Sequence, residues 1–286
     1  MKDLLKNRIL KSLIPSYINE GISDKGTPDM KYYAFDWDDN LLYMPTKIML
    51  EDEDGDEVPM GTEDFAEYRT EIGKEPFKYK GRTIVGFADD PFRNFRTEGD
   101  KVFLIDSMVA DTGPAWDDFI EAINGGSVFA IITARGHKPD TLKESVYNMI
   151  VSNHNGINKK LLIKNLRNYR SIDGMEDMSD DEIIREYLDM CQFSPVSYGS
   201  GSASNPEEGK IDAMNDFIDH VKKIAKKIHK RAFMKEKIAN KFIPMIGFSD
   251  DDIRNVEKMK THFEKNKPEG VDLTTYSTTG GIKKKY

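Results

Sequence analysis

Three short apolar runs along the chain each end in a polar or acidic residue. They are "KYYAFD" up to Asp36, "SVFAIIT" up to Thr133 and "KFIPMIGFSD" up to Asp250. Short runs with apolar side chains at consecutive positions are typical of strands that are buried on both faces of a parallel sheet. Because the carboxyl ends of parallel strands meet at one edge, where ligands bind in such sheets, we expect the three terminal residues to lie close together.

Helical periodicity fills the intervals between these strands. Helices are predicted at 114–124, at about 138–153, at 179–190 and from Pro206 onward, with weaker strand patterns at "SPVSYGS" and "VDLTTYST". Strands that alternate with helices imply right-handed crossovers and helices on both faces of the sheet. The sequence therefore predicts an α/β fold, a Rossmann-like three-layer sandwich with a central parallel sheet.

Roughly ninety residues separate the first two strands, which is more than a simple crossover needs. Within them, "TKIMLEDEDGDEVPMGT" predicts a β-hairpin with an Asp54-Gly55 turn, because apolar residues alternate on both sides of the turn. We expect residues 46–113 to form a flap or small cap over the site. The expected core is 31–45 and 114–286, with a helical insert at about 138–194 and an N-terminal helical extension at 1–30.

Composition narrows the class of protein. The chain has 286 residues, of which 32% are charged and 38% are hydrophobic, which favours a globular protein over a disordered one. Cys191 is the single cysteine, so an intrachain disulfide is excluded and a reducing compartment fits. No apolar run approaches the length of a membrane span, and the N-terminal segment lacks the apolar core of a signal peptide. We therefore expect a cytoplasmic protein without a membrane partner.

Carboxylates crowd the end of the first strand, where Asp36, Asp38 and Asp39 lie within four positions. Like charges this close repel and raise one another's pKa unless a cation or a proton lies between them. Taken alone, "FDWDDN" fits a helix cap or a solvated loop equally well. Together with "IITARG", Lys210 in "NPEEGKIDAM" and "IGFSDDD", however, it resembles the four ordered motifs of the haloacid dehalogenase-like (HAD-like) phosphatases and phosphotransferases. The resemblance covers about half of the chain.

This resemblance implies a Mg²⁺-dependent phosphomonoester hydrolase. Asp36 would be the nucleophile and form a phosphoaspartyl intermediate, and Asp38 would protonate the leaving oxygen and then activate water. Thr133 and Lys210 would bind the phosphoryl oxygens. The cation would be held by oxygen ligands, as a hard metal ion prefers: Asp36, the backbone carbonyl of Asp38, and Asp250, with Asp251 as a further metal-site candidate.

One departure from the family pattern leaves another class of protein open. The family usually has Thr or Val four residues after the nucleophile, and Asn40 stands there in this chain. An amide can donate and accept hydrogen bonds, so Asn40 can still support the loop. The competing hypothesis is a catalytically silent phosphate-binding or scaffold protein with the same fold. The presence of both Asp36 and Asp38 favours the enzyme, because a binding module has no use for an acid/base.

The acidic stretch around the predicted hairpin turn is a candidate for a second metal site. Asp52, Asp54 and Asp56 have the spacing of a calcium loop, but Glu57 occupies the position that needs glycine. We therefore interpret this stretch as a solvated hairpin tip.

Positive charge is concentrated between Lys222 and Lys241. This segment holds nine Lys or Arg and one Glu in a chain of net charge −8, so the remainder carries −16. Apolar residues at helical spacing predict one buried stripe, which would leave the lysines as a solvated face: Ile211, Met214, Ile218, Val221, Ala225, Ile228 and Ala232. The competing hypothesis is that the lysines bind the phosphates of a nucleic acid. On that basis we rank nucleotide or nucleic-acid-end phosphates above sugar phosphates as substrates, with a small-metabolite phosphatase as the alternative.

Overall fold

The computed structural model describes residues 30–167, 177–199, 205–233 and 243–286, so the predicted extension at 1–30 lies outside the described residues except for Met30. A six-stranded sheet forms the centre, in the order β12-β11-β10-β1-β8-β9. Every neighbouring pair is parallel except β11 and β12. The strands are β1 Met30–Phe35, β8 Phe129–Thr133, β9 Gln192–Pro195, β10 Pro244–Asp250, β11 Asp272–Ser277 and β12 Lys284–Lys285.

The three apolar runs are strands β1, β8 and β10, as predicted, and they are neighbours in the sheet. The strand predicted at 194–200 is wrong in its bounds, because β9 covers Gln192–Pro195. The chain turns directly after it, where the Tyr198 amide donates a hydrogen bond to the Pro195 carbonyl over 3.0 Å. The turn residues "SYG" therefore end the strand early.

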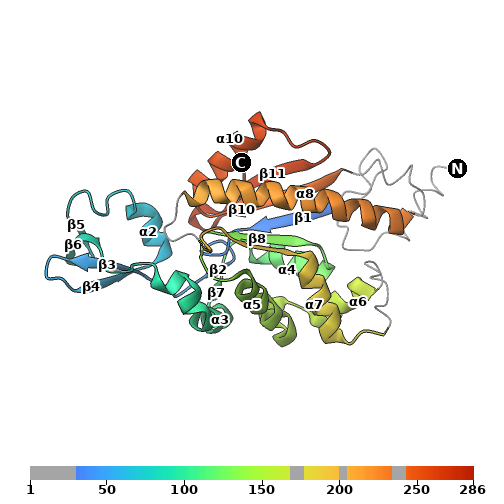
Figure 1. Cartoon of the computed structure of the whole chain (residues 1–286), viewed down its shortest axis with the longest axis horizontal. Helices are drawn as coiled ribbons and strands as arrows, with labels where there is room; N and C mark the ends of the chain where they lie inside the picture. The colour runs from blue at the N-terminus through green and yellow to red at the C-terminus, as the bar shows by residue number, and fades with distance from the viewer. Residues whose placement is uncertain (1–29, 168–176, 200–204, 234–242) are drawn as a thin grey trace.

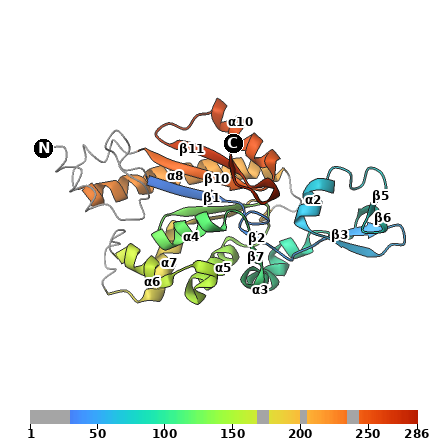
Figure 2. The ribbon, with the colours of Figure 1, turned by 180° about the vertical axis from the view of Figure 1, so that it is seen from behind.

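Helices cover both faces of this sheet (Figures 1 and 2). One core packs Phe35 and Ile131 against α4, α5 and α7, and the other packs Ala34 and Ile132 against α8 and α10. Alternate residues of a strand point to opposite faces, so each strand contributes to both cores. The helices are α4 Trp116–Gly125, α5 Pro139–Ser152, α6 Lys159–Asn165, α7 Asp180–Met190, α8 Pro206–Phe233 and α10 Ile253–Lys265, with short 3-10 turns at His154–Gly156 and Thr279–Gly281. The mixed α/β, largely parallel architecture agrees with the sequence.

The long helix α8 buries the predicted apolar stripe as far as Ala225, and the side chains of Ile228 and Ala232 lie outside the described ones. Ile211, Met214, Ile218, Val221 and Ala225 are all buried against the sheet. Lys223 is exposed beside them, as expected for a solvated face. Of the predicted basic segment, positions 234–241 lie outside the described residues.

Residues 46–113 form a second, smaller sheet of four antiparallel strands in the order β4-β3-β6-β5. The predicted hairpin is confirmed, because Ile48 pairs with Met60 and Leu50 pairs with Val58. The Asp52 carboxylate accepts hydrogen bonds from two turn amides over 3.1 and 2.9 Å and contacts Arg82, so it closes the turn. The strands are β3 Ile48–Asp52, β4 Glu57–Met60, β5 Phe77–Tyr79 and β6 Arg82–Phe87.

Two helices and a pair of short strands attach this smaller sheet to the core. Strands β2 Leu42–Tyr43 and β7 Asp111–Thr112 pair with each other, so both ends of the segment leave the core side by side. Helix α2 Thr62–Tyr68 contacts the core directly, because Arg254 donates a hydrogen bond to the Ala66 carbonyl over 3.0 Å. Helix α3 Asp100–Val109 follows two 3-10 turns, Arg93–Phe95 and Thr97–Gly99. Figure 1 shows α2 between the small sheet and the carboxyl edge of the large one.

No helix in the described part of the chain is both long enough and apolar enough to span a membrane.

Candidate active site

The candidate site lies at the carboxyl edge of the large sheet, where the strand order reverses. From β1 the chain adds β8 and β9 on one side, and then β10 and β11 on the other. A reversal of this kind opens a crevice outside the strand ends, and ligands of open α/β sheets bind there. Asp36 directly follows β1, and Asp250 ends the neighbouring strand β10.

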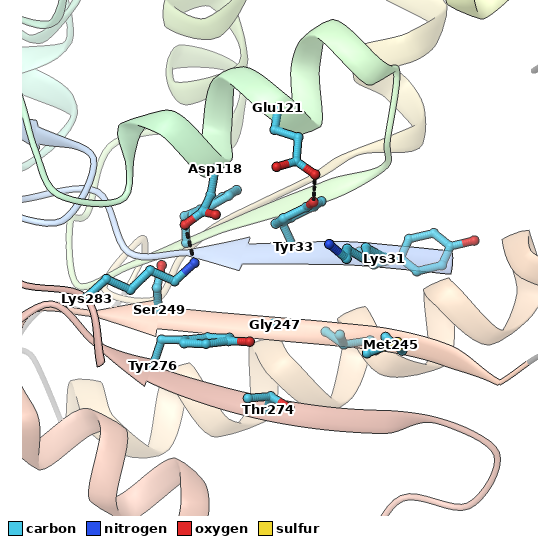
Figure 3. Close-up of a pocket in the computed structure, with 13 residues that line it drawn as sticks. Lys31, Tyr33, Asp118, Glu121, Met245, Gly247, Ser249, Thr274, Tyr276 and Lys283 are labelled. Carbon is cyan, nitrogen blue, oxygen red and sulfur yellow. Dashed lines mark hydrogen bonds and ion pairs between the residues drawn. The ribbon is translucent and has the colours of Figure 1, made fainter. Parts of the chain in front are cut away.

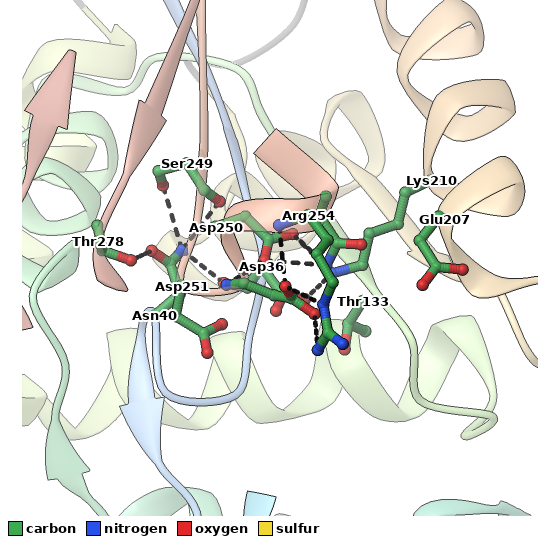
Figure 4. Close-up of polar contacts among 12 residues, drawn as sticks. Asp36, Asn40, Thr133, Glu207, Lys210, Ser249, Asp250, Asp251, Arg254 and Thr278 are labelled. Atoms are coloured by element: carbon green, nitrogen blue, oxygen red, sulfur yellow. Dashed lines mark hydrogen bonds and ion pairs between the residues drawn. The ribbon is translucent and has the colours of Figure 1, made fainter. Parts of the chain in front are cut away.

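Lys210 joins these two carboxylates (Figure 4). Its Nζ lies 3.0 Å from Oδ1 of Asp36 and 2.7 Å from Oδ2 of Asp250. The lysine sits in the second turn of α8 and is 2% exposed, and Asp36 is 6% exposed. Residues from three of the four sequence motifs thus meet in one buried group.

Asp251 completes an acidic triad with Asp36 and Asp250. One carboxylate oxygen from each residue lies within 4.8 Å of the other two. This spacing is close enough for a single cation to be bound by all three residues. Oxygen ligands of this type suit a hard divalent ion such as Mg²⁺, so the donor set fits the metal that the sequence predicts. The same geometry is also compatible with shared protons.

The electrostatics of the triad follow from burial and repulsion. Burial raises the pKa of Asp36 to about 8; Lys210 opposes this shift, and the charges of Asp250 and Asp38 add to it. The pKa of Asp251 is likewise raised well above its usual range by burial and by its two acidic neighbours. Burial lowers the pKa of Lys210, but Asp250 and Asp36 outweigh that effect and raise it. Three carboxylates around one ammonium leave an excess of negative charge, which a bound cation would neutralise.

The two acidic residues after β10 have different surroundings. Oδ1 of Asp250 accepts hydrogen bonds from the Asp252 amide at 2.9 Å and from Asn255 at 3.0 Å, while Oδ2 faces Lys210. The Asp251 carboxylate accepts no hydrogen bond from the part of the chain that the structure describes. Asp250 is therefore held in place by its donors, and Asp251 keeps its lone pairs for another ligand.

Asn40 supports the backbone behind the nucleophile candidate. Its Nδ2 donates to the Asp36 carbonyl over 3.0 Å and to the Ser249 carbonyl over 3.2 Å, and its Oδ1 accepts from the Thr278 hydroxyl over 2.8 Å. The side chain is fully buried. It joins the loop after β1 to the ends of β10 and β11. With asparagine at position 40, the loop that carries Asp36 is therefore well supported.

Gly113 packs directly against this loop. A Cβ at this position would lie 2.5 Å from the Asn40 carbonyl oxygen, so a side chain would force the backbone apart. The glycine amide donates a hydrogen bond to the Leu41 carbonyl over 2.7 Å. This contact fixes the point where the segment 46–113 returns to the core.

The remaining predicted residues stand beside the triad rather than in it. Thr133 ends β8, is 1% exposed, and its hydroxyl oxygen lies 3.4 Å from the Arg135 amide, which leaves the hydroxyl proton for another acceptor. The Asp38 carboxylate pairs with Arg135, with contacts of 2.8 and 2.6 Å, and its charge adds to the raised pKa of Asp36. The phosphoryl contacts of Thr133 and the acid/base role of Asp38 stay predictions.

Sequence reasoning missed Arg135, His137 and Asn255. A signal for the first two was present, because "TARGHKP" places a cation and an imidazole directly after a buried strand. The register of β1 and β8 pairs Phe35 with Ile131, which brings the residues after both strands together. Arg135 is therefore a neighbour of Asp38, 97 positions away in the chain.

A cavity of about 350 Å³ adjoins the triad between α2 and the loops after β10 and β11. Among the described residues that line it, five carboxylates face one guanidinium, that of Arg254. Asp39 and Asp251 belong to the motifs, while Glu63 and Glu67 come from α2. Its volume suits a small molecule, and its lining is strongly acidic.

A second hollow lies on the face of strands β1, β10 and β11 beside α4 (Figure 3). Its volume is about 120 Å³, well below the roughly 300 Å³ of the smallest usual ligand sites. Tyr33 donates a hydrogen bond to Glu121 over 3.0 Å, and Lys283 forms an ion pair with Asp118. Three of its charged or acidic groups are thus already paired, and because the hollow is small we assign it no ligand.

The chain matches no family model, no curated protein and no solved structure in the three comparisons that we made.

Proposed function

We propose that this protein is a Mg²⁺-dependent phosphomonoester hydrolase with a HAD-like core. The observation that carries the proposal is the placement of Lys210 between Asp36 and Asp250, with Asp251 beside them. These residues come from three separate segments, and they meet at the edge of the sheet where ligands bind. A solvated loop or a helix cap would not require this convergence.

The proposed reaction begins with attack of the Asp36 carboxylate on phosphorus. The bond to the ester oxygen breaks, Asp38 gives that oxygen a proton, and a phosphoaspartyl group remains on Asp36. Water then attacks this group, Asp38 takes the water proton, and inorganic phosphate leaves. Lys210 and Thr133 would donate hydrogen bonds to the phosphoryl oxygens in both steps.

A divalent cation would offset the repulsion between the carboxylate nucleophile and the negatively charged phosphoryl group. Asp36, Asp250 and Asp251 would hold it through carboxylate oxygens, together with the Asp38 carbonyl. When bound, it neutralises the repulsion between the nucleophile and the phosphoryl oxygens. It would also keep Asp36 ionised, because a nearby positive charge lowers the pKa of a carboxyl. Without the cation, burial raises that pKa to about 8, and Asp36 would be largely protonated at neutral pH.

The charge and volume of the acidic cavity indicate which kind of leaving group the substrate carries. Its described lining carries five carboxylates against one guanidinium, so a polyanion would be repelled there. Its volume of about 350 Å³ suits a metabolite. We therefore favour phosphate esters of small neutral or cationic alcohols, the alternative that the sequence ranked second. Nucleic-acid ends remain a proposal that depends on the basic segment between Lys222 and Lys241.

An aryl phosphate assay tests the proposed reaction. We expect hydrolysis of p-nitrophenyl phosphate that EDTA abolishes and that added Mg²⁺ restores, and loss of that activity in Asp36→Asn. Asp272→Asn is a matched control, because Asp272 is an exposed carboxylate at the start of β11. Turnover that is independent of metal, or full activity in Asp36→Asn, would refute the carboxylate mechanism. No turnover on a broad phosphate panel would favour the silent phosphate-binding protein instead.

The basic segment has a separate test. Replacement of Lys222, Lys223, Lys226 and Lys227 by Gln weakens oligonucleotide binding and flattens its salt dependence if these lysines neutralise phosphates. Hydrolysis of a small aryl phosphate should not change. Absence of binding in the parent protein would identify the lysines as a solvated helix face.

A further inference from the structure

Arg135 is the most deeply buried cation outside the triad among the residues that the structure describes. It follows β8 by two residues and is 1% exposed. Its Nε lies 2.8 Å from Oδ2 of Asp38, and its Nη2 lies 2.6 Å from Oδ1 of the same carboxylate. Such a bidentate pair fixes the direction of a carboxylate as well as its position.

The guanidinium is held on every other side as well. Nη2 also donates to the Thr46 hydroxyl over 3.0 Å. The rings of Phe95 and Phe103 lie 4.7 and 5.0 Å from its central carbon, within the range of cation–π contacts. Because these groups enclose the guanidinium, it cannot swing toward a substrate phosphate without leaving Asp38. The arrangement therefore suits a residue that orients Asp38 rather than one that binds the phosphate.

His137 connects this network to the segment 46–113. Its Nε2 lies 3.2 Å from Nη1 of Arg135, and its Nδ1 lies 2.8 Å from Oδ1 of Asp100. A guanidinium can only donate, so Nε2 must accept and Nδ1 must carry the proton that Asp100 accepts. The imidazole is thus a neutral link between Arg135 and the first residue of α3.

The partners of Arg135 come mainly from the segment 46–113. Thr46, Phe95 and Phe103 all belong to it, and Asp100 belongs to it as well. The Gly136 amide also donates a hydrogen bond to the Phe95 carbonyl over 2.8 Å. The segment thus fixes Arg135, and Arg135 fixes Asp38.

We propose that Arg135 is a positioning residue that aims the Asp38 carboxylate at the leaving oxygen and makes its orientation depend on the segment 46–113. This inference rests on the proposed phosphatase function. Each carboxylate oxygen has two lone pairs, and the guanidinium takes one on each oxygen. The other lone pairs remain for the proton that Asp38 gives to the ester oxygen and later takes from water.

A leaving-group series tests this inference. An ester of an acidic phenol departs without protonation, whereas an ester of a weakly acidic phenol needs the general acid. We expect Arg135→Met to lower kcat/KM roughly 100-fold for phenyl phosphate and by less than about threefold for dinitrophenyl phosphate. Arg135→Lys, which keeps the positive charge but loses the planar bidentate fork, should lie between Arg135→Met and the parent protein. Added guanidinium ions should restore part of the phenyl phosphate activity of an Arg135→Gly variant.

The control variant is Arg93→Lys. Arg93 makes a bidentate pair with Glu57 over 2.8 and 2.6 Å, but this pair is solvent-exposed and lies on the smaller sheet. The Arg93→Lys variant should leave kcat/KM unchanged for both esters. Asp100 acts on Asp38 only through His137 and Arg135, so Asp100→Leu should lower phenyl phosphate turnover selectively, but by less than Arg135→Met does. This variant keeps the inference testable if Arg135→Met does not fold.

Three other outcomes have distinct meanings. Equal losses on both esters with a raised KM and weaker inhibition by inorganic phosphate would show that Arg135 binds the phosphate, which overturns the inference. Unchanged activity in Arg135→Met and Arg135→Gly would overturn it too. Absence of Mg²⁺-dependent turnover in the parent protein on every ester would instead refute the proposed function on which the inference rests.

Discussion

Two buried charged networks meet behind the loop that follows β1, and they differ in their balance of charge. The triad places three carboxylates around the ammonium of Lys210, with contacts of 3.0 and 2.7 Å to two of them. The second network pairs the Arg135 guanidinium with the Asp38 carboxylate and ends at Asp100. In the triad, burial raises the pKa of Asp36 to about 8, and the charges of Asp250 and Asp38 add to that shift.

The difference separates two uses of buried charge. A network with excess negative charge is poised for a cation or a proton, so it can change its state during a reaction. A paired network with satisfied hydrogen bonds resists change, because removal of one partner leaves an uncompensated charge. Burial and Arg135 both lower the pKa of His137, although Asp100 opposes them, so the imidazole stays neutral and adds no charge. On the proposed function, the triad would carry the chemistry and the Arg135 network would hold the acid/base candidate Asp38 in place.

Removal of Lys210 has the largest expected effect. Lys210→Met leaves three buried carboxylates without their ammonium, so we expect the free energy of unfolding in the absence of metal to fall by about 3–5 kcal/mol at pH 8. The loss should be smaller at pH 5.5, because the carboxyls can then be protonated. Urea unfolding at both pH values measures it. Lys258→Met is the control, since its ion pair with Glu208 is exposed and long, at 3.6 Å. Equal losses at both pH values would contradict the excess of negative charge.

Removal of Asn40 tests the backbone support that the triad and the Asp38 loop share. Asn40→Ala removes the acceptor of the buried Thr278 hydroxyl and one donor to each of the Asp36 and Ser249 carbonyls, so we expect a loss of about 1–3 kcal/mol in the free energy of unfolding. Mg²⁺ affinity should fall with it, because the Asp36 backbone is no longer fixed. Urea unfolding and calorimetric titration check the two effects. A stable variant with unchanged Mg²⁺ affinity would show that the loop does not need this residue.

The excess of acid predicts how metal binding depends on pH. The folded pKa of Asp36, about 8, lies above its ordinary value of 3.8. Between these values the folded protein holds a proton that the unfolded chain releases, so the stability of the metal-free protein is full below about pH 4 and falls as pH rises through 8. A cation must displace that proton, so Mg²⁺ affinity should rise by up to about tenfold per pH unit below pH 8.

Thermal unfolding with and without Mg²⁺ at pH 6, 7 and 8 measures this dependence. The increase in Tm that Mg²⁺ causes should grow with pH. Lys258→Met should show the same trend as the parent protein. A metal effect that is independent of pH would show that Asp36 is ionised before the metal binds.

The smallest expected effect concerns the end of the Arg135 network. Asp100→Asn keeps an oxygen that can accept the proton on Nδ1 of His137, so we expect a loss below about 1 kcal/mol in the free energy of unfolding. Asp100→Leu removes the acceptor and should cost about 1–3 kcal/mol. Urea unfolding compares the two. A loss as large in Asp100→Asn as in Asp100→Leu would mean that the charge of Asp100, rather than its hydrogen bond, holds His137.

The sequence was informative about the sheet because its strands are buried on both faces. "SVFAIIT" is apolar at almost every position, and the same burial makes β8 a central strand. The triad followed from the strand ends, since parallel strands bring Asp36 and Asp250 together whatever the intervening loops do. The hairpin of β3 and β4 followed from its alternation and from Gly55, whose φ of +82° suits glycine.

The rest depends on contacts that local patterns do not encode. From the sequence alone, Arg135 is indistinguishable from a solvent-exposed arginine, because its partner Asp38 lies 97 positions away in the chain. Helix α2 has only seven residues and buries none of them fully, so it lacks the periodicity that predicts a helix. Strand β12 consists of two exposed lysines that pair with β11 at the edge of the sheet, where backbone hydrogen bonds rather than side chains decide the structure.

The most direct test of the central claim is to trap the phosphoryl group on Asp36. The protein is mixed with Mg²⁺ and an excess of p-nitrophenyl phosphate, quenched in acid within the first turnover, digested and examined by mass spectrometry. We predict that the peptide containing Asp36 gains the mass of one phosphoryl group, and that the gain is absent with EDTA and in Asp36→Asn. Rapid turnover with no phosphoryl group on this peptide, or its appearance on another residue, would contradict the account.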